Sequence, residues 1–149
     1  MIKAEVFNTT HITPMTDRKK ILILDPSPAF RHTLRALIEN GQQHLDIAEA
    51  DDAAAAKRAL QEDVPDILLI DIALPDDNGI GLIETLKKMA PEVTIIVLTS
   101  HDSAEHEHHS LERGADYFLS KERSNCANLL DIMRTAHGQR HRQTGNGAQ

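Results

Sequence analysis

Residues 66–71 read Asp66-Ile67-Leu68-Leu69-Ile70-Asp71, and residues 72–79 continue Ile72-Ala73-Leu74-Pro75-Asp76-Asp77-Asn78-Gly79. Four consecutive apolar residues thus end in a carboxylate, and Pro75 and Gly79 then turn the chain. A short apolar run bounded by turn residues is typical of a strand that is buried on both faces. Because open parallel α/β sheets carry their ligand sites at the carboxyl ends of the strands, we interpret Asp71 as a candidate nucleophile.

The composition favours one globular domain in the cytoplasm. The 149 residues suffice for a core, which must consist mainly of Leu, Ile, Val and Ala because aromatic residues make up only 3%. A net charge of −7 argues against a general nucleic-acid surface. Cys126 is the only cysteine, so no internal disulfide forms and a reducing compartment is favoured. No apolar run is long enough to span a membrane, and residues 1–16 lack the apolar core of a signal peptide.

Outward from residues 66–71, an apolar run followed by a helix-like segment occurs five times. The runs predicted as strands are residues 21–24, 45–50, 67–70, 93–98 and 117–119. This alternation predicts an α/β fold, a doubly wound five-stranded parallel sheet with helices on both faces. The expected strand order is 2-1-3-4-5, with the switch point between strands one and three. The second run is short and weakly apolar, which suits a sheet edge.

The ends of the first two helices are also predicted. Ser27 precedes a proline and caps the first helix, and Gly41 follows the end of that helix. Asp51 or Asp52 caps the second, an Ala-rich helix that continues through about Gln61.

Residues 102–113 form the weakest of the predicted helices. Their apolar face consists essentially of Ala104 and Leu111, so we expect the helix to be loosely held. This part of the chain also carries ligand-type side chains at short spacings, namely His101, Glu105, His106, Glu107, His108 and His109. A zinc site is conceivable, but no distant Cys or His pair converges on them. We favour a solvated, titratable helix face.

We expect three parts along the chain. Residues 1–18 are predicted to be a partly disordered leader, residues 19–137 the folded domain, and residues 138–149 a disordered polar tail. The tail is too short for a DNA-binding output domain, and its basic residues are better explained by solvation than by nucleic-acid contact. Cys126 lies in no activating local motif and is interpreted as structural.

Four polar residues stand at the carboxyl ends of the predicted strands: Asp25, Asp71, Thr99 and Lys121. Each alone is best explained as the start of a loop, where polar residues are common. A carboxylate pair, a hydroxyl and a lysine at one edge of the sheet together favour a functional site.

The chain resembles the receiver domain of two-component response regulators, with a flavodoxin-like (βα)5 fold. The resemblance runs from about Lys20 to Ala136 and suggests a stand-alone receiver. It depends on Leu24-Asp25 with Phe30-Arg31, on Asp71 with Pro75 and Gly79, on Leu98-Thr99-Ser100, and on Gly114-Ala115-Asp116 leading to Lys121.

The resemblance implies a phosphoryl-transfer site. Asp71 would accept a phosphoryl group from a phosphohistidine of a histidine kinase or histidine phosphotransfer protein. Mg²⁺ would be bound by Asp25, Asp71 and the backbone carbonyl of Ala73. Lys121 would pair with a phosphate oxygen as a point charge. Such a phosphoprotein is a slow autophosphatase at most and otherwise no enzyme.

The resemblance also implies how the signal leaves the domain. The Thr99 hydroxyl would donate to the phosphoryl group and move inward, and the aromatic ring of Phe118 would follow it. The face formed by the fourth helix, fifth strand and fifth helix would then change its preference for a downstream protein. A homodimer is compatible with the resemblance, whereas nucleic-acid and membrane partners are not expected.

The chain departs from the family at the position after Asp25. Receivers usually carry two adjacent acids there, and Pro26 takes the place of the second. Since proline cannot ligate through its side chain, two interpretations follow. Either Asp25 serves with weakened Mg²⁺ affinity and the protein still phosphorylates slowly, or the domain is a degenerate receiver that binds proteins without phosphorylation. A second departure is Glu122, where many receivers have proline, which we expect to affect loop geometry alone.

Two further interpretations are less favoured. Asp76 and Asp77 could hold cations, but solvated turn residues are the better prediction. A small flavin-binding protein of similar topology would need a Ser/Thr/Gly phosphate loop after the first strand. Residues 25–28, Asp-Pro-Ser-Pro, lack such a loop, because an acid would face the phosphate and the prolines remove N–H donors.

Overall fold

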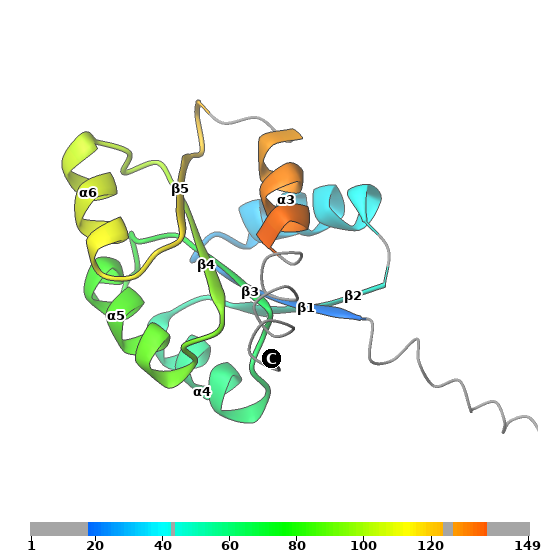
Figure 1. Ribbon diagram of the computed structural model, residues 1–149, viewed down its shortest axis with the longest axis horizontal. Coiled ribbons are helices and arrows are strands. Elements are labelled where there is room, and N and C mark those ends of the chain that lie inside the picture. The colour runs from blue at the N-terminus through cyan, green and yellow to red at the C-terminus, as the bar shows by residue number, and fades with distance from the viewer. Residues whose placement is uncertain (1–17, 43, 124–126, 137–149) are drawn as a thin grey trace, which may run out of the picture.

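Five parallel strands form a single sheet in the order β2-β1-β3-β4-β5 in a computed structural model that describes residues 18–42, 44–123 and 127–136 (Figure 1). The strands are β1 (Lys19–Leu24), β2 (Leu45–Ala50), β3 (Ile67–Ile70), β4 (Thr94–Thr99) and β5 (Tyr117–Ser120). The predicted fold class and strand order are confirmed. Three parts of the prediction lie outside the described residues: the leader before Arg18, the residue Cys126, and the polar tail.

Helices cover both faces of the sheet (Figure 1). They are α3 (Pro28–Gly41), α4 (Ala53–Glu62), α5 (Gly79–Met89), α6 (Ala104–Glu112) and a helix over residues 127–136. One core cluster joins α4 and α5 to one face, and a second joins α3 and residues 127–136 to the other. In the described part of the chain, no helix has the length and apolar character needed to cross a membrane.

The central strands pack on both faces, as the sequence predicts. Leu22 and Leu24 of β1 belong to the core under α4 and α5, whereas Ile21 and Ile23 belong to the core under α3. All four residues of β3 are buried. Since successive side chains of a strand point to opposite faces, a continuous apolar run is required here.

Helix ends follow the predicted chemistry with small differences. The Ser27 hydroxyl accepts the Phe30 N–H at 3.1 Å, which confirms the cap of α3. Asp52 rather than Asp51 caps α4. Gly41 is the last residue of α3 instead of the residue after its end, and α4 ends at Glu62.

The predicted apolar face of α6 is wrong. Ala104 and Leu111 are exposed, and the only buried residue of α6 is Ser110, whose hydroxyl has no hydrogen-bond partner in the structure. A small side chain therefore faces the sheet, and the larger Leu111 lies 41% exposed to solvent. This helix therefore buries little apolar surface. Residue spacing alone did not reveal which side of the helix meets the sheet.

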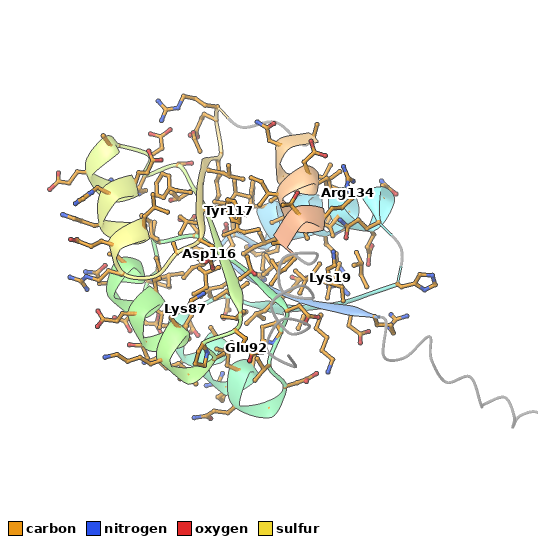
Figure 2. The ribbon with its side chains drawn as sticks, in the orientation of Figure 1. Lys19, Lys87, Glu92, Asp116, Tyr117 and Arg134 are labelled. Atoms are coloured by element: carbon orange, nitrogen blue, oxygen red, sulfur yellow. The ribbon has the colours of Figure 1, made fainter. Side chains whose placement is uncertain are left out.

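Two lysines connect helices to the sheet (Figure 2). Lys87 of α5 donates to the Val93 carbonyl at 2.6 Å and to the Asp116 carboxylate at 3.0 Å. Lys19 of β1 donates to the Met133 carbonyl at 3.4 Å. Burial lowers the pKa of Lys19, since it penalises the charged form more than Asp66 restores it. The ammonium of Lys19 thus lies beneath the last described helix.

The start of α5 lies very close to the backbone that follows β3. A Cβ on Gly79 would lie 2.3 Å from the Ile72 carbonyl oxygen and 2.4 Å from the Ile72 Cα. Nothing lies within 4 Å of a Cβ on Gly81 in the same helix. Only glycine therefore allows the loop after Asp71 to close onto α5.

We predict opposite effects for alanine at these two glycines. Gly79→Ala should lower the free energy of unfolding by about 3 kcal/mol or more, because backbone must move. Gly81→Ala should raise it by about 0.5–1 kcal/mol through helix propensity. Urea denaturation of both variants measures this difference, and equal effects would contradict the proposed close approach.

Candidate functional site

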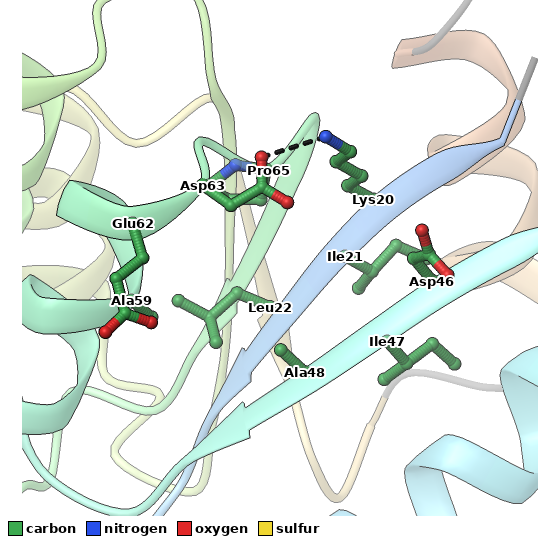
Figure 3. A pocket seen from close by; sticks show the side chains of 10 residues that line it. All are labelled: Lys20, Ile21, Leu22, Asp46, Ile47, Ala48, Ala59, Glu62, Asp63 and Pro65. Carbon is green, nitrogen blue, oxygen red and sulfur yellow. Dashed lines mark hydrogen bonds and ion pairs between the residues drawn. The ribbon is translucent and has the colours of Figure 1, made fainter. Parts of the chain in front are cut away.

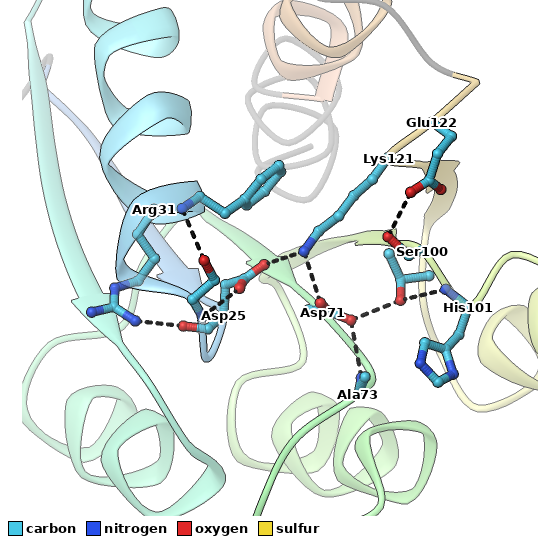
Figure 4. A network of polar contacts seen from close by, with 11 residues as sticks. Asp25, Arg31, Asp71, Ala73, Ser100, His101, Lys121 and Glu122 are labelled. Carbon is cyan, nitrogen blue, oxygen red and sulfur yellow. Dashed lines mark hydrogen bonds and ion pairs between the residues drawn. The ribbon is translucent and has the colours of Figure 1, made fainter.

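The four predicted site residues lie together at the carboxyl edge of the sheet (Figure 4). Asp25 follows β1, Asp71 follows β3, Thr99 ends β4 and Lys121 follows β5. Parallel neighbours bring the carboxyl ends of these strands to one edge. The convergence that the sequence predicts is therefore present.

Lys121 bridges the two carboxylates. Its Nζ lies 2.8 Å from Asp25 Oδ2 and 2.9 Å from Asp71 Oδ2. Burial alone would lower the pKa of Lys121, but hydrogen bonds and charge from Asp25 and Asp71 outweigh it, so the pKa lies above its ordinary value. The ammonium is thus held charged between two nearly buried acids.

The Asp71 carboxylate has further donors on its other oxygen. Asp71 Oδ1 accepts the Thr99 hydroxyl at 2.7 Å and the Ala73 N–H at 3.0 Å. Thr99 Oγ1 in turn accepts the His101 N–H at 3.1 Å. Thr99 already points at Asp71, and its side chain is fully buried. Both oxygens of Asp71 are therefore oriented by the protein.

The loop after β1 holds Asp25 from both sides. Asp25 Oδ1 accepts the Ser27 N–H at 2.8 Å, and the Asp25 carbonyl accepts from Arg31 Nη1 at 2.6 Å. Arg31 also pairs with Glu49 at 2.9 Å. The hydrogen bond from Arg31 is the main cause that holds the pKa of Glu49 below its usual range. The resemblance includes Arg31 but predicts no contact between it and Asp25.

The oxygen donors suit a hard cation such as Mg²⁺. Each carboxylate oxygen of Asp25 and Asp71 accepts one or two hydrogen bonds, and lone pairs remain on the two Oδ2 atoms and on Asp25 Oδ1. Among the described residues, no group of three or more His, Cys, Asp or Glu is arranged to hold a metal ion. A site built from Asp25 and Asp71 would thus need a backbone carbonyl, and the ligand role of Ala73 stays a prediction.

Two loops at the rim of the site are joined by side chains. The Ser100 hydroxyl donates to Glu122 at 2.9 Å (Figure 4). The Ser120 hydroxyl donates to Asp102 at 2.6 Å, and this bond is the main cause that lowers the pKa of Asp102. Glu122, which the sequence suggested would affect loop geometry alone, connects the loop after β5 to the loop after β4.

Asp76 has a structural partner that the sequence did not reveal. Its two carboxylate oxygens accept the Ala53 N–H at 2.9 Å and the Ala54 N–H at 3.2 Å. The N–H groups in the first turn of a helix have no acceptor within the helix, and Asp76 satisfies two such donors of α4. The loop that follows Asp71 is thereby attached to the neighbouring helix. Asp77, by contrast, accepts from the Asn78 N–H beside it at 2.7 Å.

The remaining candidates lie away from the carboxylate pair. Phe118 is half-buried and packs against the core under α4 and α5, and its switching role stays a prediction. His106 is paired with the Ser103 hydroxyl at 2.8 Å, and its ring lies 5.7 Å from the His101 ring. His108 and His109 are exposed, consistent with a solvated helix face.

A cavity of about 300 Å³ lies elsewhere, towards the amino ends of β1 and β2 (Figure 3). Leu22, Ala48 and Ala59 line it, and the Lys20–Asp63 ion pair of 2.8 Å crosses its rim. None of the four predicted site residues lines this cavity. The carboxylate site therefore lies at the other end of the strands from this cavity.

Residues 21–134 match the response regulator receiver domain family. This match covers most of the chain and includes all four convergent residues. The chain therefore belongs to the response regulator receiver domain family.

Curated relatives agree with this assignment. The chain is 31% identical over 102 residues to the transcriptional regulatory protein PhoP of Escherichia coli K12. The matched residues cover 68% of this chain and 45% of PhoP. It is also 34% identical over 119 residues to the protein-glutamate methylesterase/protein-glutamine glutaminase 2 of Vibrio vulnificus. The matched residues cover 78% of this chain and 34% of that protein. The chain thus spans less than half the length of either relative.

A solved structure has the same fold. The response regulator receiver domain protein (CheY-like) from Methanospirillum hungatei JF-1 matches with a TM-score of 0.77 at 26% identity. The match covers 85% of this chain and 99% of that one.

We predict that Asp76 stabilises the protein in a pH-dependent way. Hydrogen bonds from the α4 backbone lower the pKa of Asp76, so its contribution is present above the unfolded pKa of about 3.9 and is lost as pH falls through the folded value. Asp76→Asn should therefore be less stable than wild type at neutral pH, and the difference should narrow in acid. Urea denaturation of both proteins, from neutral pH down to the acid range, measures this difference in the free energy of unfolding.

Asp77→Asn is the matched control, because it removes the same charge from the adjacent residue and leaves the hydrogen bonds to the α4 backbone in place; Asp77 reaches α4 through Lys57 Nζ at 3.9 Å. An equal loss in both variants would show that Asp76 acts through its charge and not through the two backbone N–H groups of α4.

Proposed function

We propose that this chain is a phosphoryl-accepting response regulator of a two-component phosphorelay, phosphorylated on Asp71. The observation that supports this most is the environment of the Asp71 carboxylate. An ammonium group lies 2.9 Å from one oxygen, and a hydroxyl lies 2.7 Å from the other. Phosphoryl transfer needs an oriented nucleophile and donors that stabilise the oxygens of the transferred group.

The proposed reaction forms an acyl phosphate. A carboxylate oxygen of Asp71 attacks the phosphorus of a phosphohistidine, a P–O bond forms and the P–N bond breaks. The bond electrons remain on the imidazole nitrogen, which takes up a proton. Lys121 shifts from the carboxylate to a phosphoryl oxygen, and the Thr99 hydroxyl donates to another.

Magnesium is the cofactor we propose for this site. Asp25, Asp71 and the Ala73 carbonyl would hold the ion, which would neutralise charge on the transferring oxygens. In this proposal Asp25 orients the ion and Lys121 together, because its carboxylate is fixed by the Ser27 N–H.

The phosphoryl donor would be a histidine kinase or a histidine phosphotransfer protein in the cytoplasm. The output would be a protein contact through α6, β5 and residues 127–136. The weak burial of α6 supports a movable element here. The domain would be no enzyme beyond slow loss of its own phosphoryl group.

A second candidate is a degenerate receiver that binds its partner without phosphorylation. Pro26 removes a usual metal-binding acid, and Lys121 already neutralises much of the charge of Asp25 and Asp71. Such a site would be stable without Mg²⁺. Metal affinity therefore separates the two candidates.

We predict that wild-type protein incubated with Mg²⁺ and a small phosphodonor gains the mass of one phosphoryl group, because the Asp71 carboxylate lies beside two hydrogen-bond donors. Intact mass spectrometry measures the adduct, and Asp71→Asn should gain nothing. An acyl phosphate should also be lost in mild base. Failure to form an adduct at any magnesium concentration would support the degenerate receiver instead.

A further inference from the structure

The Lys121 ammonium has a third neighbour besides the two acids. Its Nζ lies 3.9 Å from the centre of the Phe30 ring, on α3. A cation over an aromatic face is attracted by the ring's electrons, most strongly where water is partly excluded. The side chain of Lys121 is only 15% exposed, so this contact is poorly screened by solvent.

The loop that supplies Asp25 also fixes Phe30. The Ser27 N–H donates to Asp25 Oδ1, and the Ser27 hydroxyl accepts the Phe30 N–H. The ring itself packs against the core cluster under α3. Carboxylate and ring are thus parts of one short, capped segment, and both meet the ammonium from the β1 side.

The Phe30 ring holds the Lys121 ammonium in a way that a third carboxylate would not. It attracts the ammonium without a formal charge and without accepting its protons strongly. When a phosphoryl group is attached to Asp71, Nζ can exchange the Asp71 oxygen for a phosphoryl oxygen and remain over the ring. In a chain whose Pro26 supplies no second acid, this contact restrains a flexible four-carbon side chain.

We propose that Phe30 is a positioning residue that holds the Lys121 ammonium between Asp25 and Asp71, ready to receive the phosphoryl oxygens. The catalytic part of this inference rests on the proposed phosphorylation of Asp71. The contact between ring and ammonium does not, and it is tested separately.

The test uses the full chain and three variants. Phe30→Leu keeps apolar bulk but lacks an aromatic face, and Phe30→Tyr keeps the face. Leu37→Ala is the matched control, because Leu37 lies on the same helix and packs against the same core cluster. The position of Lys121 is followed at neutral pH by the NMR signal of its Cε group, assigned by the signal missing in Lys121→Arg.

We expect the NMR signal of the Lys121 Cε protons to lose the upfield displacement caused by the Phe30 ring current in Phe30→Leu, and to keep it in Phe30→Tyr and Leu37→Ala. Phosphorylation by the small donor should slow roughly three- to tenfold in Phe30→Leu and recover in Phe30→Tyr. An unchanged Lys121 Cε signal in Phe30→Leu, or the same change in Leu37→Ala, would overturn the inference. The signal change in a chain that never forms the adduct would support the ring contact and count against the proposed function.

Discussion

One ammonium group, shared by two nearly buried carboxylates, is the interaction on which the rest of the structure depends. Asp25 and Asp71 are only 3% and 6% exposed, and two unpaired charges at such depth would be costly. Lys121 pairs with both carboxylates, although it comes from the far side of β4 in the sheet order. The pairing therefore requires β1, β3 and β5 to be in place together, so the chemistry of the site and the completion of the sheet are coupled.

The loops around this pair are connected to one another as well as to the sheet. The Ser100–Glu122 and Ser120–Asp102 hydrogen bonds connect the loop that follows Thr99 to the loop that carries the lysine. The two donors that face the candidate phosphoryl group are thus presented by a joined unit. A displacement of either loop would be felt by the other, which fits a domain whose output depends on a local change of charge.

Much of this could be predicted from the sequence, because buried parallel strands require continuous apolar runs and leave polar residues where they end. The contacts that determine the fine geometry could not. Glu122 and Asp76 find partners across loops, and no local spacing encodes how far a side chain reaches. The face of α6 was misassigned because Ala104 and Leu111 are spaced as a helical stripe, whereas the sheet contacts the small Ser110.

We propose that Lys121 leaves the Asp71 carboxylate for the oxygens of a phosphoryl group bound there. A crystal structure of the protein with Mg²⁺ and beryllofluoride, a mimic of the phosphoryl group, is the decisive measurement. We expect the mimic on an Asp71 oxygen, with Lys121 Nζ and the Thr99 hydroxyl each within hydrogen-bonding distance of a fluoride. A structure in which Asp71 stays unmodified at saturating beryllofluoride, or in which Lys121 remains on both carboxylates beside the mimic, would contradict it.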